Sequence, residues 1–192
     1  MLEDLIRKSR SYRRFDESFG IEEGILRELV GLARVSPSAR NRQALKFILS
    51  CSPEKNSLIF SSLGWALDLK DWKGPEKGER PAAYIIILGD ERIAREFGCD
   101  HGIAAQSILL GAVEKGLGGC IMGSVDRGAL RKDLNIPERY GILLVIALGK
   151  PAEKVVLEDA GTGGSIKYYR DEKDVHHVPK RPIDELIIDT RH

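Results

Sequence analysis

The sequence predicts an α+β fold in which one β-sheet lies between two layers of helices. Continuous apolar runs at residues 82–89 and 141–149 are typical of strands that are covered on both faces. Residues 98–116 form a helical pattern that is apolar around nearly its whole circumference, which indicates a buried helix. Because apolar strands alternate with helices along the chain, we expect helical layers on both sides of the sheet. Residues 1–192 are expected to form a single domain.

The N-terminal quarter of the chain contains two predicted helices and one strand. A short helix is predicted at residues 1–8, and a longer one at residues 21–35, where apolar residues recur at helical spacing. The longer helix should end there because Pro37 disfavours helical backbone at the residue before it. The short apolar run at residues 46–50 is predicted to be a strand. The apolar side chains of the first helix, which we expect to face inward, are Leu2, Leu5 and Ile6.

The middle of the chain supplies three further elements. A helix is predicted at residues 53–63, and a strand at residues 117–123 that is entered and left through glycines. A short helix follows at residues 126–134, with Asp126 as its N-cap. Residues 65–81 are mixed in composition, and we expect them to form a surface segment and part of a pocket wall.

The composition changes after Lys150. Gly161-Thr162-Gly163-Gly164 breaks regular structure and is interpreted as a hinge, and residues 161–192 are expected to form an extended tail. A segment of this length without an obvious element is typically functional, partner-wrapping or mobile. Because Leu186-Ile187-Ile188 would be unusual on a free tail, we expect it to dock on a sheet edge of this subunit or of another.

Charge and cysteine content exclude several classes of protein. Lys plus Arg number 30 and Asp plus Glu 29, a balance that argues against a nucleic-acid partner. The three cysteines are far apart and form no C-x-x-C, so neither a disulfide framework nor a zinc ribbon is indicated. No signal peptide is visible, and no apolar run approaches the ~20 residues of a membrane span. We therefore expect a cytoplasmic protein without a membrane partner.

The turn at residues 36–43 is rich in specific polar groups. Ser38, Asn41 and Gln43 can each donate and accept hydrogen bonds. That mixture suits the edge of a planar, heteroatom-rich ligand. Taken alone, the stretch fits a solvated loop with Asx-type turns equally well.

A basic segment follows the first helix. Five of the eight residues from Arg7 to Arg14 are Lys or Arg. Arg holds phosphate oxygens by a bidentate fork and Ser by its hydroxyl, so Arg10, Ser11 and Arg13 are candidates for an anion site. The alternative is a solvated helix end, where cations favour the negative pole of the helix dipole.

Two later stretches share this theme. The glycines of residues 118–123 leave a backbone that a flat ligand can approach closely, and Lys180 and Arg181 add positive charge. Together, the motifs resemble those of the nitroreductase family of FMN-dependent enzymes, in the same order and over nearly the whole chain. The matching stretches are Ser9-Arg10-Ser11-Tyr12-Arg13-Arg14-Phe15, Ser36-Pro37-Ser38-Ala39-Arg40-Asn41-Arg42-Gln43, Gly116-Leu117-Gly118-Gly119-Cys120-Ile121-Met122-Gly123 and Gly149-Lys150-Pro151.

The resemblance implies a three-layer α/β/α fold with a central, mostly antiparallel sheet flanked by helices. It also implies a homodimer with FMN at the subunit interface and a C-terminal tail that extends onto the partner. The flavin would carry the electron chemistry, so no catalytic side chain is required. A backbone N–H near Met122 would be directed at flavin N5. The residues that the resemblance assigns to FMN are Arg10, Ser11, Arg13, Pro37, Ser38, Ala39, Asn41, Gln43, Ile121, Met122, Gly123, Lys180 and Arg181.

The chain departs from the family pattern in three places. The second motif is commonly followed by Pro-Trp, where this chain has Ala44-Leu45. Many members have a Glu near N5, where this chain has Cys120-Ile121-Met122. Residues 65–81 are shorter than the excursion that covers the active site in some members, and Trp65 and Trp72 are candidates for a lid.

Other candidate sites have simpler interpretations. Cys99-Asp100-His101 are neighbours on a predicted helix and point in different directions, so they do not converge on one metal ion. We interpret His176-His177 as a structural or ribityl-side contact rather than a metal pair. Cys120 is interpreted as a small buried hydrophobe rather than a redox thiol.

Two classes of function remain open. The first is an FMN-dependent oxidoreductase that transfers electrons from NADH or NADPH to a small acceptor, such as a nitroaromatic or a quinone, by ping-pong kinetics. The second is a flavin-binding, flavin-modifying or sensing protein on the same fold without nicotinamide-dependent activity. The chain has no Rossmann Gly-x-Gly-x-x-Gly after a strand, which fits a transiently docked nicotinamide as well as none.

Overall fold

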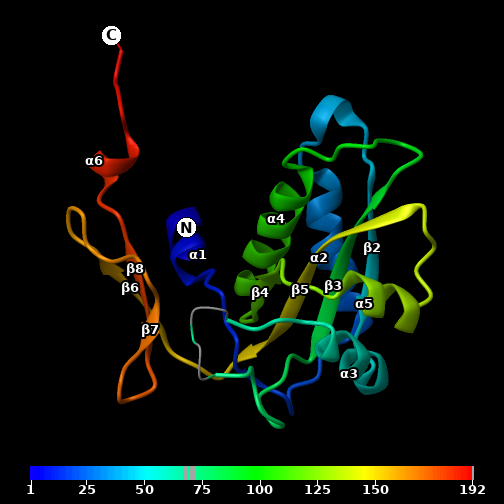
Figure 1. Ribbon diagram of the computed structural model, residues 1–192, viewed down its shortest axis with the longest axis horizontal. Helices are drawn as coiled ribbons and strands as arrows, with labels where there is room; N and C mark the ends of the chain where they lie inside the picture. The colour runs from blue at the N-terminus through cyan, green and yellow to red at the C-terminus, as the bar shows by residue number, and fades with distance from the viewer. Residues whose placement is uncertain (67–68, 70–71, 192) are drawn as a thin grey trace.

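The computed structural model describes residues 1–66, 69 and 72–191. Its main sheet has five strands in the order β1-β5-β3-β2, and β4 pairs with β5 beyond the end of β1; all of these pairs are antiparallel. Figure 1 shows this sheet in the centre of the molecule. The strands are β1 (Phe15–Asp16), β2 (Leu45–Ser50), β3 (Ala83–Asp90), β4 (Gly118–Met122) and β5 (Tyr140–Pro151).

Helices cover both faces of the main sheet (Figure 1). Helices α2 (Glu23–Val35) and α4 (Asp100–Glu114) lie on one face, and α3 (Pro53–Ser61) and α5 (Arg127–Asp133) on the other. Alternation along β3 divides the core, because Ile85 and Ile87 face α2 and α4 while Ile86 and Leu88 face α3 and α5. The predicted α+β fold, with an antiparallel sheet between helical layers, is confirmed.

Local signals in the sequence explain where these elements begin and end. Helix α2 ends at Val35, and Ser36 before Pro37 is extended with φ −71° and ψ 151°. Asp126 caps α5 as predicted, since its carboxylate accepts the N–H of Ala129 at 3.0 Å. A Cβ on Gly111 would lie 2.3 Å from the side chain of Leu32, so this glycine lets α2 and α4 approach closely.

Two burial predictions were wrong. In α1 (Leu2–Lys8), Leu2 is 63% exposed and Ile6 is 44% exposed, whereas Leu5 is half-buried. In the segment 65–81, Trp65 is 7% exposed and packs at 5.7 Å from the ring of Phe60, so it belongs to the core rather than the surface. Residues 67–68 and 70–71 of that segment lie outside the described residues.

The tail contains regular elements that the sequence did not reveal. Strands β6 (Val155–Asp159), β7 (Tyr169–Arg170) and β8 (His176–Lys180) form a separate sheet, which we call the tail sheet, in which β6 and β8 are parallel. A short helix, α6 (Ile183–Leu186), follows. In Figure 1 the tail sheet stands apart from the main sheet, and the C-terminus projects away from both. The docking of the last residues on a sheet edge stays a prediction, with Ile188 98% exposed.

No helix among the described residues is both long enough and apolar enough to cross a membrane.

Candidate functional site

The N-terminal basic segment lies against the edge of β4. Ser11 forms an isolated bridge with Gly119, and the N–H of Tyr12 donates to the carbonyl of Gly119 at 3.0 Å. Because backbone groups alternate in direction along an antiparallel strand, those of Ile121 face the same side as those of Gly119, away from β5. The structure therefore brings Arg10, Ser11 and Arg13 together with β4, and we call this group the arginine half-site.

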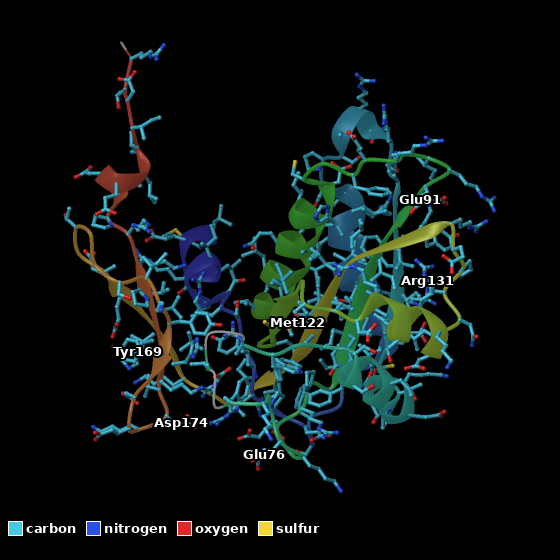
Figure 2. All side chains as sticks on the ribbon, in the orientation of Figure 1. Glu76, Glu91, Met122, Arg131, Tyr169 and Asp174 are labelled. Atoms are coloured by element: carbon cyan, nitrogen blue, oxygen red, sulfur yellow. The ribbon has the colours of Figure 1, made fainter. Side chains whose placement is uncertain are left out.

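This edge of β4 is open to a flat ligand. The side chain of Ile121 is 38% exposed, and no atom lies within 4 Å of a Cβ built on Gly123. Met122 is 4% exposed and packs in the core, so its side chain is not the accessible part of this edge. Figure 2 shows Met122 near the centre of the molecule, with Tyr169 and Asp174 on the tail sheet.

Arg13 is held by several contacts from the tail. Its guanidinium lies 4.9 Å from the ring centroid of Tyr168, and its Nη1 lies 3.4 Å from Nε2 of His176. Burial lowers the pKa of His176 to about 4, so this ring is neutral at neutral pH and adds no second positive charge beside Arg13. Nη1 also donates to the carbonyl of Ser11 at 3.3 Å.

A buried carboxylate fixes the backbone beside Arg13. The side chain of Glu153 is 2% exposed, and its Oε1 accepts the N–H groups of Arg13 and, at 3.0 Å, of Arg14. Its Oε2 pairs with Arg170 of β7 at 2.5 Å. Burying a carboxylate is costly unless it is paired and hydrogen-bonded, and these contacts satisfy both needs. The sequence analysis missed Glu153, which stands two residues after the Gly149-Lys150-Pro151 motif and could only be linked to Arg13 by the fold.

Arg10 carries a donor without a partner. Its Nη2 donates to the carbonyl of Ile6 at 2.6 Å, but its Nε is buried and has no hydrogen-bond partner among the described residues. Burial lowers the pKa of the Arg10 guanidinium from its usual value, because the charged form loses solvation. Such an orphaned donor on a cation fits an anionic ligand group, as the resemblance to FMN enzymes requires.

The Pro-Ser stretch lies at the other end of the molecule's central helix. The N–H of Ala39 donates to both carboxylate oxygens of Asp100, at 3.0 and 3.2 Å, and Asp100 is the first residue of α4. We call this group, which surrounds the 3₁₀ turn at Ala39–Asn41, the loop half-site. Its predicted members are Pro37, Ser38, Ala39, Asn41 and Gln43.

The loop half-site has a strained backbone. The φ angles of Arg40, Asn41 and Gln43 are 54°, 51° and 51°, a region that favours glycine. Three such residues within four positions persist only where surrounding contacts determine the conformation, and this is typical of functional loops. Gln43 adopts this conformation next to Ala44, whereas a proline at position 44 would favour an extended residue before it.

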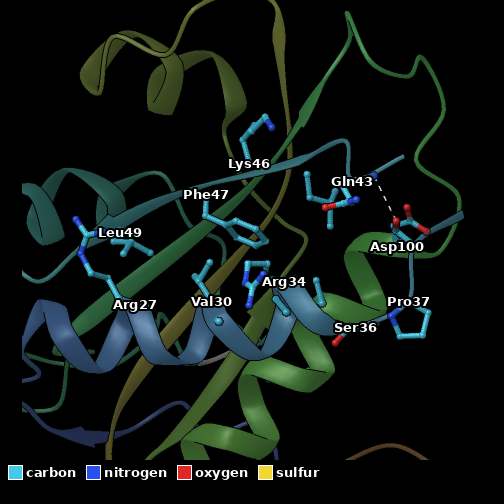
Figure 3. Close-up of a pocket in the computed structure, with 15 residues that line it drawn as sticks. Arg27, Val30, Arg34, Ser36, Pro37, Gln43, Lys46, Phe47, Leu49 and Asp100 are labelled. Carbon is cyan, nitrogen blue, oxygen red and sulfur yellow. Dashed lines mark hydrogen bonds between the residues drawn. The ribbon is translucent and has the colours of Figure 1, made fainter. Parts of the chain in front are cut away.

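A pocket of about 600 Å³ opens between α2 and β2 beside this loop. Figure 3 shows Pro37 and Gln43 at one end of the pocket, near Asp100, and Phe47 and Leu49 of β2 along its wall. None of the residues of the arginine half-site lines it.

The predicted site residues therefore form separate groups within one subunit. Asp100 begins α4 and Gly118 follows its end, and the 15 residues of this helix span ~22 Å. Lys180 ends β8, about 13 Å along the strand from His176, which contacts Arg13. Arg181 follows and pairs with Glu185 at 3.2 Å.

The remaining candidate residues have structural surroundings. Cys120 is 3% exposed, and burial raises the pKa of its thiol, so it remains protonated at neutral pH. Trp72 lies between the guanidinium groups of Arg14 and Arg170, at 5.8 and 5.3 Å from its ring, and a lid role for it stays a prediction. Within the described part of the chain, no group of three or more His, Cys, Asp or Glu side chains could hold a metal ion.

Comparisons with known proteins agree on one family. YodC of Bacillus subtilis (strain 168), whose name describes an NAD(P)H nitroreductase, is 26% identical and covers 77% of this chain and 88% of its own length. The nitroreductase family protein of Streptococcus pneumoniae TIGR4 superposes with a TM-score of 0.71 at 18% identity, over 99% of this chain and all of that one. An FMN-dependent nitroreductase from Clostridium difficile R20291 gives 0.63 at 23% identity, over 78% and 87%. Both structures share the fold. The model of the nitroreductase family matches residues 6–150, and the chain therefore belongs to that family.

Proposed function

We propose that this protein is an FMN-dependent oxidoreductase that transfers electrons from NADH or NADPH to a small acceptor such as a nitroaromatic or a quinone. Family membership supports an oxidoreductase, YodC is named for NAD(P)H, and one structural neighbour is named as FMN-dependent. The observation that carries the proposal is the orphaned donor of Arg10 next to the open edge of β4.

The chain's own residues have separate tasks in this proposal. Arg10, Lys180 and Arg181 hold the phosphate, and Ser11 holds the ribityl chain. Arg13 places a positive charge at the edge of the ring where negative charge develops on reduction. The backbone N–H groups of Ile121 and Gly123 face the reactive side of the ring. A bound FMN would supply the electron chemistry, and the nicotinamide and the acceptor would use the same open side of the site in turn.

We propose that the complete site is formed by a homodimer. The two half-sites lie at opposite ends of α4, so a ring that touches both requires one half from each subunit. A two-fold axis would join them twice and produce two equivalent sites.

The tail supplies a second reason for a dimer. Leu186, Ile187 and Ile188 are more than half exposed, while β2 ends the main sheet and has a free edge within the described residues. We propose that the tail extends onto the partner and covers this edge.

An absorbance spectrum and an anaerobic titration test the function. The purified protein, or the protein reconstituted with FMN, should show the visible bands of a bound flavin. Anaerobic NADH or NADPH should bleach these bands, and a nitroaromatic or a quinone should restore them. Bound flavin that neither nucleotide bleaches would instead indicate a flavin-binding, flavin-modifying or sensing protein. A colourless protein that takes up no FMN would contradict both functions.

A further inference from the structure

A second pocket, of about 380 Å³, lies apart from both half-sites and contains none of their residues. It is enclosed by the loop after β1, the start of α3 and the segment that leads into β3. Its ionisable lining consists of a carboxylate, two cations, a thiol and a phenol, which belong to Glu17, Lys77, Arg80, Cys51 and Tyr84. Asn56 and Ser57 add an amide and a hydroxyl, and the remaining lining is apolar or glycine.

Arg80 is an unpaired cation in this pocket. Its guanidinium group lies over the ring of Phe60, with Cζ 4.3 Å from the ring centroid, and this contact restricts the orientation of the guanidinium. Its Nε is buried, and neither a hydrogen bond nor an ion pair satisfies the side chain among the described residues. Most partly buried arginines are paired, so this one is prepared for an anion that the described residues do not supply.

Two neighbours restrict what that anion can be. Tyr84 is 1% exposed, and its hydroxyl has no hydrogen-bond partner in the part of the chain that the structure describes. Burial raises the pKa of Tyr84 above its usual range, so the hydroxyl stays protonated and can donate. Glu17 is fixed in place because its carboxylate accepts the backbone N–H of Gly78 and, at 3.4 Å, that of Arg80. Its charge offsets one of the two positive charges of Lys77 and Arg80, so the lining favours a ligand with one negative charge over a ligand with two.

We propose that this pocket binds a small organic monocarboxylate with an apolar or aromatic body. The fork of Arg80 matches the two oxygens of a carboxylate, and the Tyr84 hydroxyl adds a third donor. Phe60, Pro81 and Ile21 provide apolar walls for the body of the ligand. Glu17 selects against dianions such as phosphate esters. The volume lies in the usual range for small-molecule pockets, which begins at about 300 Å³.

The cysteines of the chain provide a footprinting test. Cys51 is exposed and lines the pocket, whereas Cys99 is exposed but lies outside it. The alkylation rates of both thiols by uncharged iodoacetamide would be followed by mass spectrometry of the full-length protein with increasing phenylacetate. We expect saturable protection of Cys51, about fivefold or more, with the rate at Cys99 unchanged. Equal rates at Cys51 with and without phenylacetate, or equal protection of both thiols, would overturn the proposal.

Related ligands and two variants test which groups of the ligand and of the pocket cause the protection of Cys51. Phenylacetamide, which lacks the charge, and phenyl phosphate, which is a dianion at pH 8, should protect Cys51 about tenfold less well than phenylacetate. Arg80→Met should weaken the phenylacetate effect by a similar factor, while Arg95→Met at an exposed position outside the pocket should not. If Arg80→Met does not fold, Tyr84→Phe replaces it and should weaken protection without loss of the fold. Undiminished protection in the folded variant, or equal protection by phenyl phosphate, would contradict the assigned chemistry.

Discussion

At the scale of single residues, Glu153 joins three segments that are distant in sequence. It lies just after β5, accepts the backbone N–H groups of Arg13 and Arg14, and pairs with Arg170 of the tail sheet. Its charge is therefore part of the support for the arginine half-site. The sequence makes Arg13 a candidate for an anion site, but it cannot show which buried group holds the arginine in place, because that contact spans 140 residues.

Replacement of Glu153 should have a large effect. Glu153→Gln leaves the Arg170 guanidinium facing a neutral amide in a buried position, and we expect a loss of about 3 kcal/mol in the free energy of unfolding. FMN affinity should fall as well. The control is Glu79→Gln, because Glu79 pairs with Arg14 at 3.3 Å but is 38% exposed, and it should cost less than about 1 kcal/mol. Urea denaturation measures both variants, and equal losses would contradict the role of Glu153.

The strained backbone of the loop half-site predicts a substitution that stabilises the protein. Arg40 has a φ of 54°, and glycine at this position removes a steric cost of about 1–2 kcal/mol while giving up a smaller amount of backbone entropy. Arg40→Gly should therefore stabilise the protein by about 0.5 kcal/mol. Arg42, with an ordinary φ of −68°, is the matched control, and Arg42→Gly should destabilise the protein by a similar amount. Thermal melts that move in the same direction for both variants would argue against strain at Arg40.

At the scale of elements, β8 carries two adjacent histidines with opposite electrostatic surroundings. His176 is buried, and this burial lowers its pKa to about 4, with Arg13, Glu153 and Arg170 as its charged neighbours. His177 stacks on Tyr169 with ring centroids 4.7 Å apart. Hydrogen bonds to Asp171, at 3.1 Å, and to Glu158 raise the pKa of His177 above 6.5. The side chains of a strand alternate between its two faces, which explains how neighbours experience such different environments.

This pair should make the stability of the tail sheet depend on pH with a maximum near pH 6.5. The contribution of His177 to the stability of the folded state is complete below pH 6.5 and is lost as the pH rises through its raised pKa. The contribution of His176, which folds as the neutral ring, is lost as the pH falls from 6.5 towards about 4. Amide exchange in β8 across this range measures the effect, and NMR titration assigns the two pKa values. His177→Asn should remove the alkaline decline and keep the acidic one; a variant that keeps both would exclude His177 as its cause.

The elements differ in how well the sequence predicts them. Strands β3 and β5 are continuous apolar runs and α2 has a regular apolar face, so hydrophobic periodicity alone locates them. The strands of the tail sheet are two to five residues long, and β7 and β8 carry mainly polar or charged side chains. Distant contacts such as the ion pair of Glu153 with Arg170 hold this sheet in place. Local patterns do not contain that information.

At the scale of the whole molecule, α4 separates the two half-sites. The motifs of both can be recognised from the sequence, but their separation cannot, because it depends on which end of α4 each segment contacts. The family motifs in the sequence and the positions of the two half-sites in the structure are therefore independent observations. Together they support the proposed dimer.

The dimer predicts complementation between two defective variants. Arg10→Ala damages the arginine half-site and Asn41→Ala the loop half-site, so each homodimer should bind FMN poorly. When equal amounts are refolded together, half of the dimers should be mixed, and each mixed dimer has one site with both halves intact. FMN binding should recover in about a quarter of the sites. If both halves of a site came from one subunit, titration of the mixture with FMN would show no recovery.

The position of Trp72 has a further consequence. The chain has two tryptophans, and Trp65 is buried in the core, whereas Trp72 lies between Arg14 of the N-terminal segment and Arg170 of the tail sheet. Any movement of the tail sheet away from the main sheet removes one guanidinium from the indole of Trp72 and leaves Trp65 unchanged. The molecule thus contains its own fluorophore at the junction, and the emission of Trp72 in a Trp65→Phe background can follow tail attachment in real time without an added label.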